Sequence, residues 1–230
     1  QAGLDSTNAD EAWTQERTDP RAIQGNVYTL EVAVWTKHRS ILGGEHVQDV
    51  AGWRGCTYAV GSGADLRSEF EAGEVFRYLW VSFDAGATFV TVERLAYPEA
   101  GGGDTRWVHL LPTADTLHLF GYAFDFENGT ASPRNAGYEG GDVTEEASGD
   151  LADLFALGTM ALPDGTGLVH GILVRGSPLP YVLWHVQADG SILEVDLGGR
   201  HVLDLVLHPA TEEVMVLAAP GDAYPTEEPD

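Results

Sequence analysis

Histidines are the residues of this chain whose positions first suggest chemistry. Six of the eight fall in or beside β-rich runs: His109, His118, His170, His185, His201 and His208. Histidines that converge from neighbouring strands can bind a metal ion. We take His201 and His208 as the pair to test first, because they bracket one predicted strand. Residues seven apart point to opposite faces of a regular strand, so scattered strand histidines are the alternative.

Carboxylates offer a second kind of site. The segment Asp125–Thr130 places Asp125, Glu127 and Asn128 in one predicted turn, and Ca²⁺ prefers oxygen ligands of this kind. The spacing differs from that of an EF-hand, so a solvated charged loop is the alternative. We therefore predict that the chain binds no cofactor. The candidate to test against this prediction is a Ca²⁺ ion bound at this turn. Carboxylate pairs also hydrolyse glycosides, but the sequence does not set their separation.

The charge of the chain limits its partners. The 36 acidic and 12 basic residues give a net charge of −24. This balance argues against nucleic acid, whose phosphates need clustered cations, and against an anionic membrane surface. Two stretches without a basic residue, 139–153 and 212–230, hold six carboxylates each. We interpret the charge as a surface property that gives solubility, salt tolerance or attraction to a basic partner.

Short strands are predicted along most of the chain. Phe120, Tyr122, Phe124 and Phe126 occupy every second position and would form one aromatic face. The 28 glycines and 11 prolines fall mostly between such runs, as tight turns require. Helical pattern is confined to one or two turns, at 69–74 and at 150–157.

A regular spacing organises these strands. Three segments share the layout strand, proline-containing turn, strand, and their prolines Pro112, Pro163 and Pro209 lie 51 and 46 residues apart. Periods of this length are typical of four-stranded propeller blades. We therefore predict an all-β fold, a β-propeller of about four to five blades, with a β-sandwich as the alternative. The propeller would span 21–219, between an N-terminal extension (1–20) and an acidic tail (220–230).

One motif carries a family resemblance. The segment Ser82–Phe89 resembles the Asp-box, or BNR repeat, of sialidases and related propellers, and all five defined positions match: Ser82, Asp84, Gly86, Thr88 and Phe89. The Asp84 carboxylate would accept hydrogen bonds from turn amides, and Gly86 would take a positive φ. The resemblance implies a structural turn inside a propeller blade, away from any active centre.

Catalytic residues of a sialidase are not apparent. Such an enzyme would need an arginine triad, a Tyr–Glu pair and an acidic proton donor, and Arg21 lies in Pro-Arg-Ala-Ile where the family has Phe-Arg-Ile-Pro. We therefore predict a non-catalytic propeller that acts as a protein- or glycan-binding module or as an extrinsic subunit of a hetero-oligomeric complex. The alternative is a sialidase-like glycoside hydrolase.

The first residue of the chain bears on its compartment, whereas the cysteine count is neutral. The chain begins at Gln1, as a mature end left by signal-peptide removal would, and as an incomplete sequence would. Cys56 is the only cysteine, so no intramolecular disulfide forms. The longest apolar stretch, 154–174, contains Pro163 and Asp164, so no membrane insertion is expected. We predict an extracytoplasmic protein, periplasmic or secreted.

Overall fold

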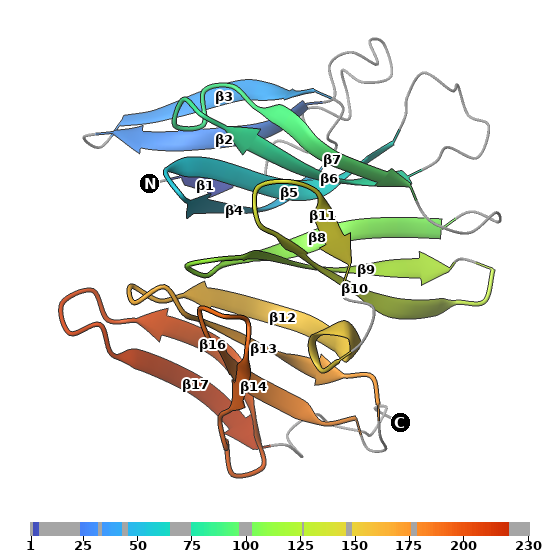
Figure 1. The fold of residues 1–230 in the computed structure, drawn as a ribbon, viewed down its shortest axis with the longest axis vertical. Helices are drawn as coiled ribbons and strands as arrows, with labels where there is room; N and C mark the ends of the chain where they lie inside the picture. The colour runs from blue at the N-terminus through green and yellow to red at the C-terminus, as the bar shows by residue number, and fades with distance from the viewer. Residues whose placement is uncertain are drawn as a thin grey trace, which may run out of the picture.

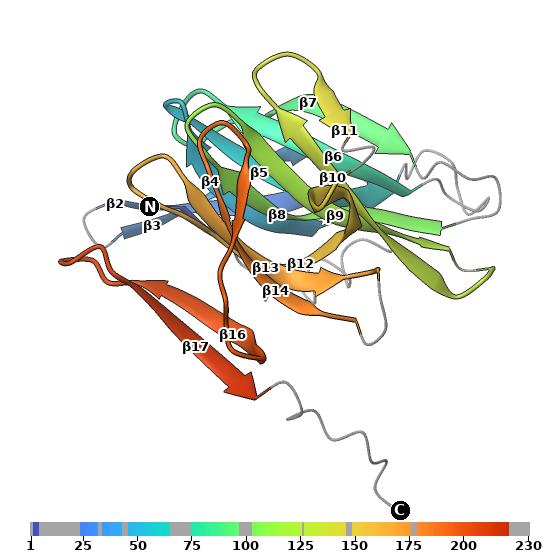
Figure 2. The ribbon, with the colours of Figure 1, turned by 60° about the horizontal axis from the view of Figure 1, so that its bottom comes forward.

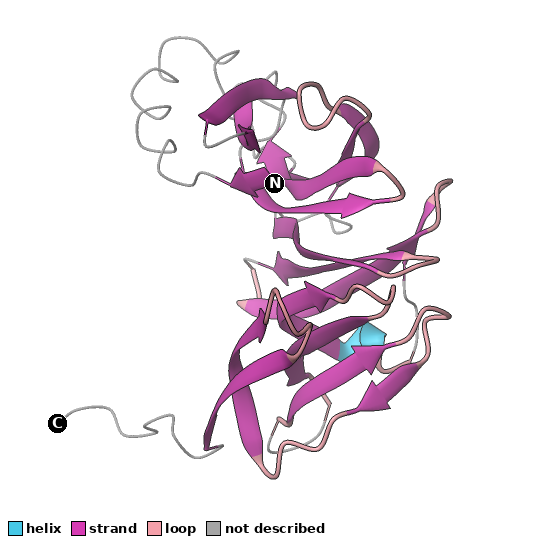
Figure 3. Ribbon diagram, turned by 90° about the vertical axis from the view of Figure 1, so that its left-hand side faces the viewer, coloured by secondary structure: helices cyan, strands magenta, loops and turns pink. Residues whose placement is uncertain are grey.

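The computed structural model describes residues 2–4, 24–31, 34–42, 46–64, 75–96, 103–125, 127–145, 149–175 and 179–220. Antiparallel strands account for most of them (Figure 3), and the one helix among these residues is a 3₁₀ turn, η2 (Leu151–Asp153). No helix of this part of the chain is long and apolar enough to span a membrane.

Three complete sheets form the middle of the molecule, and each is a meander of four consecutive strands. The first contains β4 (His46–Trp53), β5 (Cys56–Ala64), β6 (Val75–Ser82) and β7 (Val90–Ala96). The second contains β8 (Gly103–Pro112), β9 (Leu117–Asp125), β10 (Thr130–Tyr138) and β11 (Val143–Glu145). The third contains β12 (Leu154–Ala161), β13 (Gly167–Leu173), β14 (Tyr181–Val186) and β15 (Ile192–Glu194).

A smaller sheet lies at each end of the row (Figure 1). One has the strands β1 (Ala2–Leu4), β2 (Gln24–Glu31) and β3 (Val34–Leu42). The other is the hairpin of β16 (Arg200–Leu207) and β17 (Val214–Pro220). Strand β1 lies within the segment that we expected to be an extension.

The predicted all-β propeller fold is confirmed, with three four-stranded blades and two smaller sheets among the described residues. The prolines of the repeat lie at equivalent places: Pro112 ends β8, Pro163 follows β12, and Pro209 follows β16. Each marks the turn between the first and second strands of a sheet. The spacing of the prolines therefore follows the spacing of the blades.

The core lies between neighbouring blades. The first strands β4, β8, β12 and β16 follow one another side by side (Figure 2). Trp107 is fully buried between the β4–β7 and β8–β11 sheets, and Phe120 is buried between the β8–β11 and β12–β15 sheets. Burial of each large apolar side chain stabilises the fold by about 1.5–3 kcal/mol. Blade stacking therefore fixes how the first strands lie together.

Two local predictions have mixed outcomes. The aromatic face on β9 is half realised, since Phe120 is buried while Tyr122 and Phe124 are partly exposed. The helix predicted over 150–157 is wrong beyond its first turn, because Leu154 already begins β12. The predicted helical segment 69–74, Arg21 and Phe126 lie outside the described residues.

Candidate functional site

A β-bulge interrupts each of the four first strands at an equivalent place. The register with the second strand shifts just before Asp49 in β4, His109 in β8, Gly158 in β12 and Asp204 in β16. A bulge places two residues opposite one and redirects the side chains beside it. The same β-bulge therefore directs the side chain of the residue that follows it in four successive sheets.

Three of these positions carry titratable groups, and the fourth is filled from the next strand. A Cβ atom on Gly158 would lie 2.5 Å from Nε2 of His170 on β13, so the His170 imidazole occupies the space of a side chain at 158. His170 lies close enough to His109 to lower the pKa of that imidazole, and Asp204 lies close enough to His170 to raise its pKa. We call Asp49, His109, His170 and Asp204 the inner-strand cluster.

Two hydrogen bonds between blades fix the backbone of Leu110, which lies next to His109 of the cluster. Its backbone amide donates to Oδ2 of Asp49 across 2.8 Å, from β8 to β4. Its carbonyl accepts a 2.9 Å hydrogen bond from the Thr159 hydroxyl of β12. Because Leu110 follows His109 directly, these two bonds fix the backbone beside that imidazole.

Burial shapes the electrostatics of the cluster. It raises the pKa of Asp49, although the amides of Leu110 and Val50 that donate to the carboxylate act in the other direction. Burial also lowers the pKa of His109, with a smaller contribution from His170. It lowers the pKa of His170 as well, against the attraction of Asp204. The cluster thus comprises a mostly buried carboxyl group, two neutral imidazoles and the exposed carboxyl group of Asp204. Groups of this kind can transfer protons.

The predicted histidine pair is not brought together. His201 is the second residue of β16 and His208 follows its last residue, so the two are about 23 Å apart at 3.3 Å per residue. His201 is buried with its ring 4.9 Å from that of Tyr181. His208 accepts a 3.1 Å hydrogen bond from the amide of Thr211 in the β16–β17 turn. Each ring thus has its own local environment.

The predicted Ca²⁺ turn is closed by its own hydrogen bonds. Oδ1 of Asp125 accepts from the amides of Glu127 and Asn128, and Oδ2 accepts from the Asn128 side chain at 2.6 Å. These bonds lower the pKa of Asp125. In the ranges that the structure describes, no group of three or more His, Cys, Asp or Glu side chains is placed to hold a metal ion. Ca²⁺ at this turn stays a prediction.

The turn Ser82–Phe89 joins β6 to β7 and forms a dense hydrogen-bond network. The Asp84 carboxylate accepts from the Thr88 amide (2.8 Å) and hydroxyl (2.6 Å) and from the Ser82 hydroxyl (2.7 Å). These bonds lower the pKa of Asp84 to about 2. Gly86 has a φ of +94°, and Phe89 packs partly buried against the blade. The turn stabilises the third and fourth strands and lies outside the inner-strand cluster.

Sequence reasoning missed most of the cluster. Asp49 and Asp204 were not singled out, and His109 and His170 were only two of six strand histidines. Alignment of the blades at the ends of their first strands would have superimposed His109, Gly158 and Asp204. The prolines mark those strand ends only within two residues, because Pro112 lies in β8 whereas Pro163 and Pro209 follow β12 and β16.

Comparisons with known proteins were made by sequence and by structure. No protein-family model and no curated protein matches the chain. Solved structures that match include the GH93 α-L-arabinofuranosidase of Fusarium graminearum with arabinobiose, at 13% identity and a TM-score of 0.43. Another is the α-L-arabinofuranosidase Arb93A of Fusarium graminearum with an iminosugar inhibitor, at 13% identity and a TM-score of 0.42. Each match covers 77% of this chain and 59% of the solved one, so the chain spans about three fifths of their length.

These matches correct one prediction. Both enzymes named above are glycoside hydrolases, a finding that goes against the predicted non-catalytic binding module or extrinsic subunit. That prediction is wrong by this comparison. The alternative left open by the sequence, a glycoside hydrolase, is therefore the one to weigh against the geometry of the site.

Proposed function

We propose that this protein hydrolyses glycosidic bonds at the inner-strand cluster. One observation carries the proposal: equivalent β-bulges place carboxyl groups in unlike surroundings on the first and the last of four neighbouring inner strands, with two neutral imidazoles on the blades between them. Asp49 is mostly buried, whereas Asp204 is exposed. Glycoside hydrolysis needs two carboxyl groups of this kind, one protonated and one ionised.

The proposed roles follow from these surroundings. Asp49, whose pKa is raised by burial, is the general acid that gives its proton to the glycosidic oxygen as the C–O bond breaks. Asp204 is the carboxylate that activates water or attacks the anomeric carbon. Water supplies the hydroxyl group of the released sugar, and its remaining proton restores the acid. His109 and His170, both neutral, would each offer one donor and one acceptor to sugar hydroxyls.

The setting of the activity is part of the proposal. The likeness of Ser82–Phe89 to an Asp-box supports a place in the sialidase-like superfamily, with this turn as a structural brace. A glycan is the proposed ligand, and an extracytoplasmic location would give access to it. A protein partner in a hetero-oligomeric complex stays a prediction.

Purified protein tests the activity directly. A panel of aryl sialosides, pyranosides and furanosides should contain at least one substrate that releases its aryl group. Asp204→Asn should lower kcat by about 10²-fold or more on any substrate found, and Asp49→Asn should do so on a substrate whose leaving group needs a proton. Glu194→Gln, an exposed carboxylate on β15, should leave kcat unchanged. Absence of turnover on the whole panel, or full activity in both variants, would contradict the proposal.

A further inference from the structure

The outer edge of the last sheet is open. Within the described residues, β17 pairs with β16 alone, whereas each of the three middle sheets has four strands. Strand β17 lies at one end of the row of sheets (Figure 1). An unpaired strand presents a row of backbone groups that a further strand can bind. We call the outer side of Val214–Pro220 the β17 edge.

The backbone groups of the β17 edge follow from the turn that precedes it. The amide of His208 donates to the carbonyl of Glu213 across 2.9 Å, so the backbone of Glu213 faces β16. Facing and outward residues alternate along an antiparallel strand. The amides and carbonyls of Val214, Val216 and Ala218 therefore point outward, away from β16.

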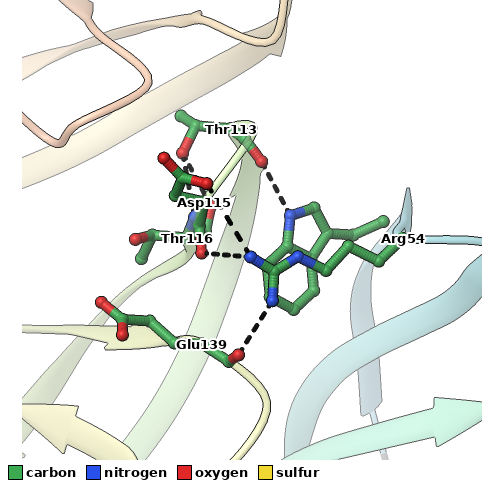
Figure 4. A network of polar contacts seen from close by, with 6 residues as sticks. Arg54, Thr113, Asp115, Thr116 and Glu139 are labelled. Carbon is green, nitrogen blue, oxygen red and sulfur yellow. Dashed lines mark hydrogen bonds and ion pairs between the residues drawn. The ribbon is translucent and has the colours of Figure 1, made fainter.

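Backbone carbonyls at the seam between two middle sheets are paired, in contrast to this edge. Arg54, in the β4–β5 turn, donates to the carbonyl of Glu139 at 3.0 Å and to that of Asp115 at 3.1 Å (Figure 4). The Trp53 indole donates to the carbonyl of Thr113 at 2.7 Å. The outward groups of β17 have no such partner in the part of the chain that the structure describes. They are available to another strand.

The side chains of β17 do not protect its edge. Natural sheets guard exposed edges with charged residues or with very short strands. The outer strands of the middle sheets follow this rule, because β7 contains Glu93 and Arg94, and β11 and β15 have three residues each and end in a glutamate. Strand β17 has seven residues, none of them charged, and Met215, Val216 and Leu217 are exposed. It is a long, uncharged edge of the kind that pairs with another chain.

We propose that the β17 edge binds the same edge of a second copy of this chain, related to the first by a two-fold axis. Antiparallel pairing with Val216 opposite Val216 of the second copy places Val214 opposite Ala218 in both directions. Every outward amide then meets an outward carbonyl. The ladder ends at Pro220, which has no amide hydrogen. The two hairpins together form a sheet of four strands, as in the middle of the molecule.

The charges at the ends of the edge favour this arrangement. Glu212 and Glu213 precede β17, and Arg200 on β16 lies opposite Pro220 at the other end. Glu212 and Arg200 are exposed, and neither has an ion-pair partner among the described residues. The antiparallel contact brings Glu212 of one copy beside Pro220 of the other, one strand away from Arg200. Opposite charges therefore meet at both ends, and a second copy supplies them by symmetry.

The contact should be weak. Pairing of two seven-residue strands makes a small interface, and the net charge of −24 on each copy opposes association. We therefore expect a Kd on the order of 10–100 µM. Amide exchange should be fast in the monomer and should slow at Val214 and Val216 as the dimer forms.

Sedimentation equilibrium of the full chain at pH 7 tests the proposal. Between about 1 and 500 µM, the unaltered protein should shift from monomer to dimer. Val216→Lys places two ammonium groups opposite each other and should weaken dimerisation at least about tenfold. Leu193→Lys adds the same charge at an exposed leucine of β15 and is the matched control, so it should dimerise as the unaltered protein does.

A charge swap separates loss of pairing from loss of folding. Val216→Glu alone should dimerise as poorly as Val216→Lys. An equimolar mixture of the two variants should form a heterodimer, with a Kd within about threefold of that of the unaltered protein. Recovery in the mixture requires that both variants fold and that residue 216 of one copy meets residue 216 of the other.

Four results would overturn the proposal. They are a monomer at every concentration, undiminished dimerisation of Val216→Lys, a mixture that stays monomeric, and a monomer whose Val214 and Val216 amides are already protected. In the last case a segment of the same chain occupies the edge. Hydrolysis plays no part in these measurements, so this proposal and the proposed function can fail independently.

Discussion

Leu110 shows at the scale of one residue how neighbouring blades position a site. Its amide is bound by Asp49 from one side, and its carbonyl by Thr159 from the other. Leu110 itself is 3% exposed, so both bonds lie in a largely dry region, where a lost partner is costly. These two bonds also restrict the backbone next to His109 and so help to position its side chain.

Loss of the Thr159 hydroxyl should loosen this arrangement. Thr159→Val keeps the shape and removes the donor to the Leu110 carbonyl, so the free energy of unfolding should fall by about 1–3 kcal/mol. Urea unfolding at pH 7 measures the change. An unchanged midpoint would show that the bond does not contribute to stability.

The His118 ring should titrate far from an ordinary histidine. Its pKa is lowered from 6.5 to about 4 by burial. The unfolded chain therefore binds a proton near pH 6.5 that the folded chain binds only near pH 4. The stabilisation is complete above pH 6.5 and falls by up to about 3 kcal/mol as the pH drops to 4. NMR titration of the ring, assigned with His118→Phe, checks this, and a midpoint near 6.5 would refute it.

The stabilisation by the Asp84 carboxylate should be lost at a lower pH than that of His118. Its pKa is lowered from 3.8 to about 2 by the Thr88 and Ser82 hydrogen bonds, so its contribution is present above pH 3.8 and is lost as the pH falls to 2. At pH 7, Asp84→Ala should lower the Tm by about 2–4 °C. Thermal unfolding followed by circular dichroism measures this, with Glu194→Gln as the control. Equal Tm values for both variants would count against a bracing role for the turn.

At the scale of elements, the β-bulge determines which residues of the repeated first strands form the inner-strand cluster. Strand β12 carries glycine at the position that holds Asp49, His109 and Asp204 elsewhere, and the His170 ring fills the space. Repetition of one backbone device thus brings different side chains to equivalent places. The glycine is required by the close approach of the imidazole.

Gly158→Ala tests this arrangement. The added Cβ would meet Nε2 of His170 at 2.5 Å and displace the ring, so hydrolysis should fall more than stability does. Gly52→Ala is the matched control on β4, because nothing lies within 4 Å of a Cβ there. Kinetics and thermal unfolding of both variants give the comparison. Normal kcat in Gly158→Ala would show that the position of His170 does not matter.

The blades were predictable from the sequence, and the inner-strand cluster was not. Turn residues such as Pro163 and alternating runs such as 181–186 act locally, so they identify strands and their period. A bulge depends on the pairing of two strands, and the approach of His170 to Gly158 depends on that register. The proximity of His109 and His170 arises from the stacking of blades, which the period alone does not fix. His201 and His208 were chosen because they bracket one predicted strand, and that strand holds them apart.

At the scale of the whole molecule, the two ends of the row differ from its middle. The last sheet has two strands where each of the three middle sheets has four, and Met215 and Leu217 on β17 are 51% and 60% exposed. Strand β9, by contrast, pairs on both sides. Few buried contacts mean a low local stability.

Hydrogen exchange should show this gradient. Backbone amides of β17 should exchange at least about tenfold faster than those of β9 at pH 7, because β17 opens without disruption of the blade core. Exchange followed by NMR or mass spectrometry gives the rates. Equal protection of both strands would contradict the gradient.

The charge of −24 should make stability depend on salt. Repulsion among surface carboxylates is screened as the Debye length falls from about 10 Å at 0.1 M salt to about 3 Å at 1 M. The Tm should therefore rise between these NaCl concentrations, as calorimetry can show. A constant or falling Tm would mean that the surface charge does not limit stability.

The central claim is that Asp49 acts as the proton donor in glycoside hydrolysis, and leaving-group dependence tests it most directly. A dinitrophenyl leaving group departs without a proton, whereas an alkyl leaving group needs one. The account predicts that Asp49→Asn loses about 10²-fold or more in kcat/KM on an alkyl glycoside and far less on the matching dinitrophenyl glycoside. An equal loss on both substrates, or no hydrolysis of either by the unaltered protein, would contradict it.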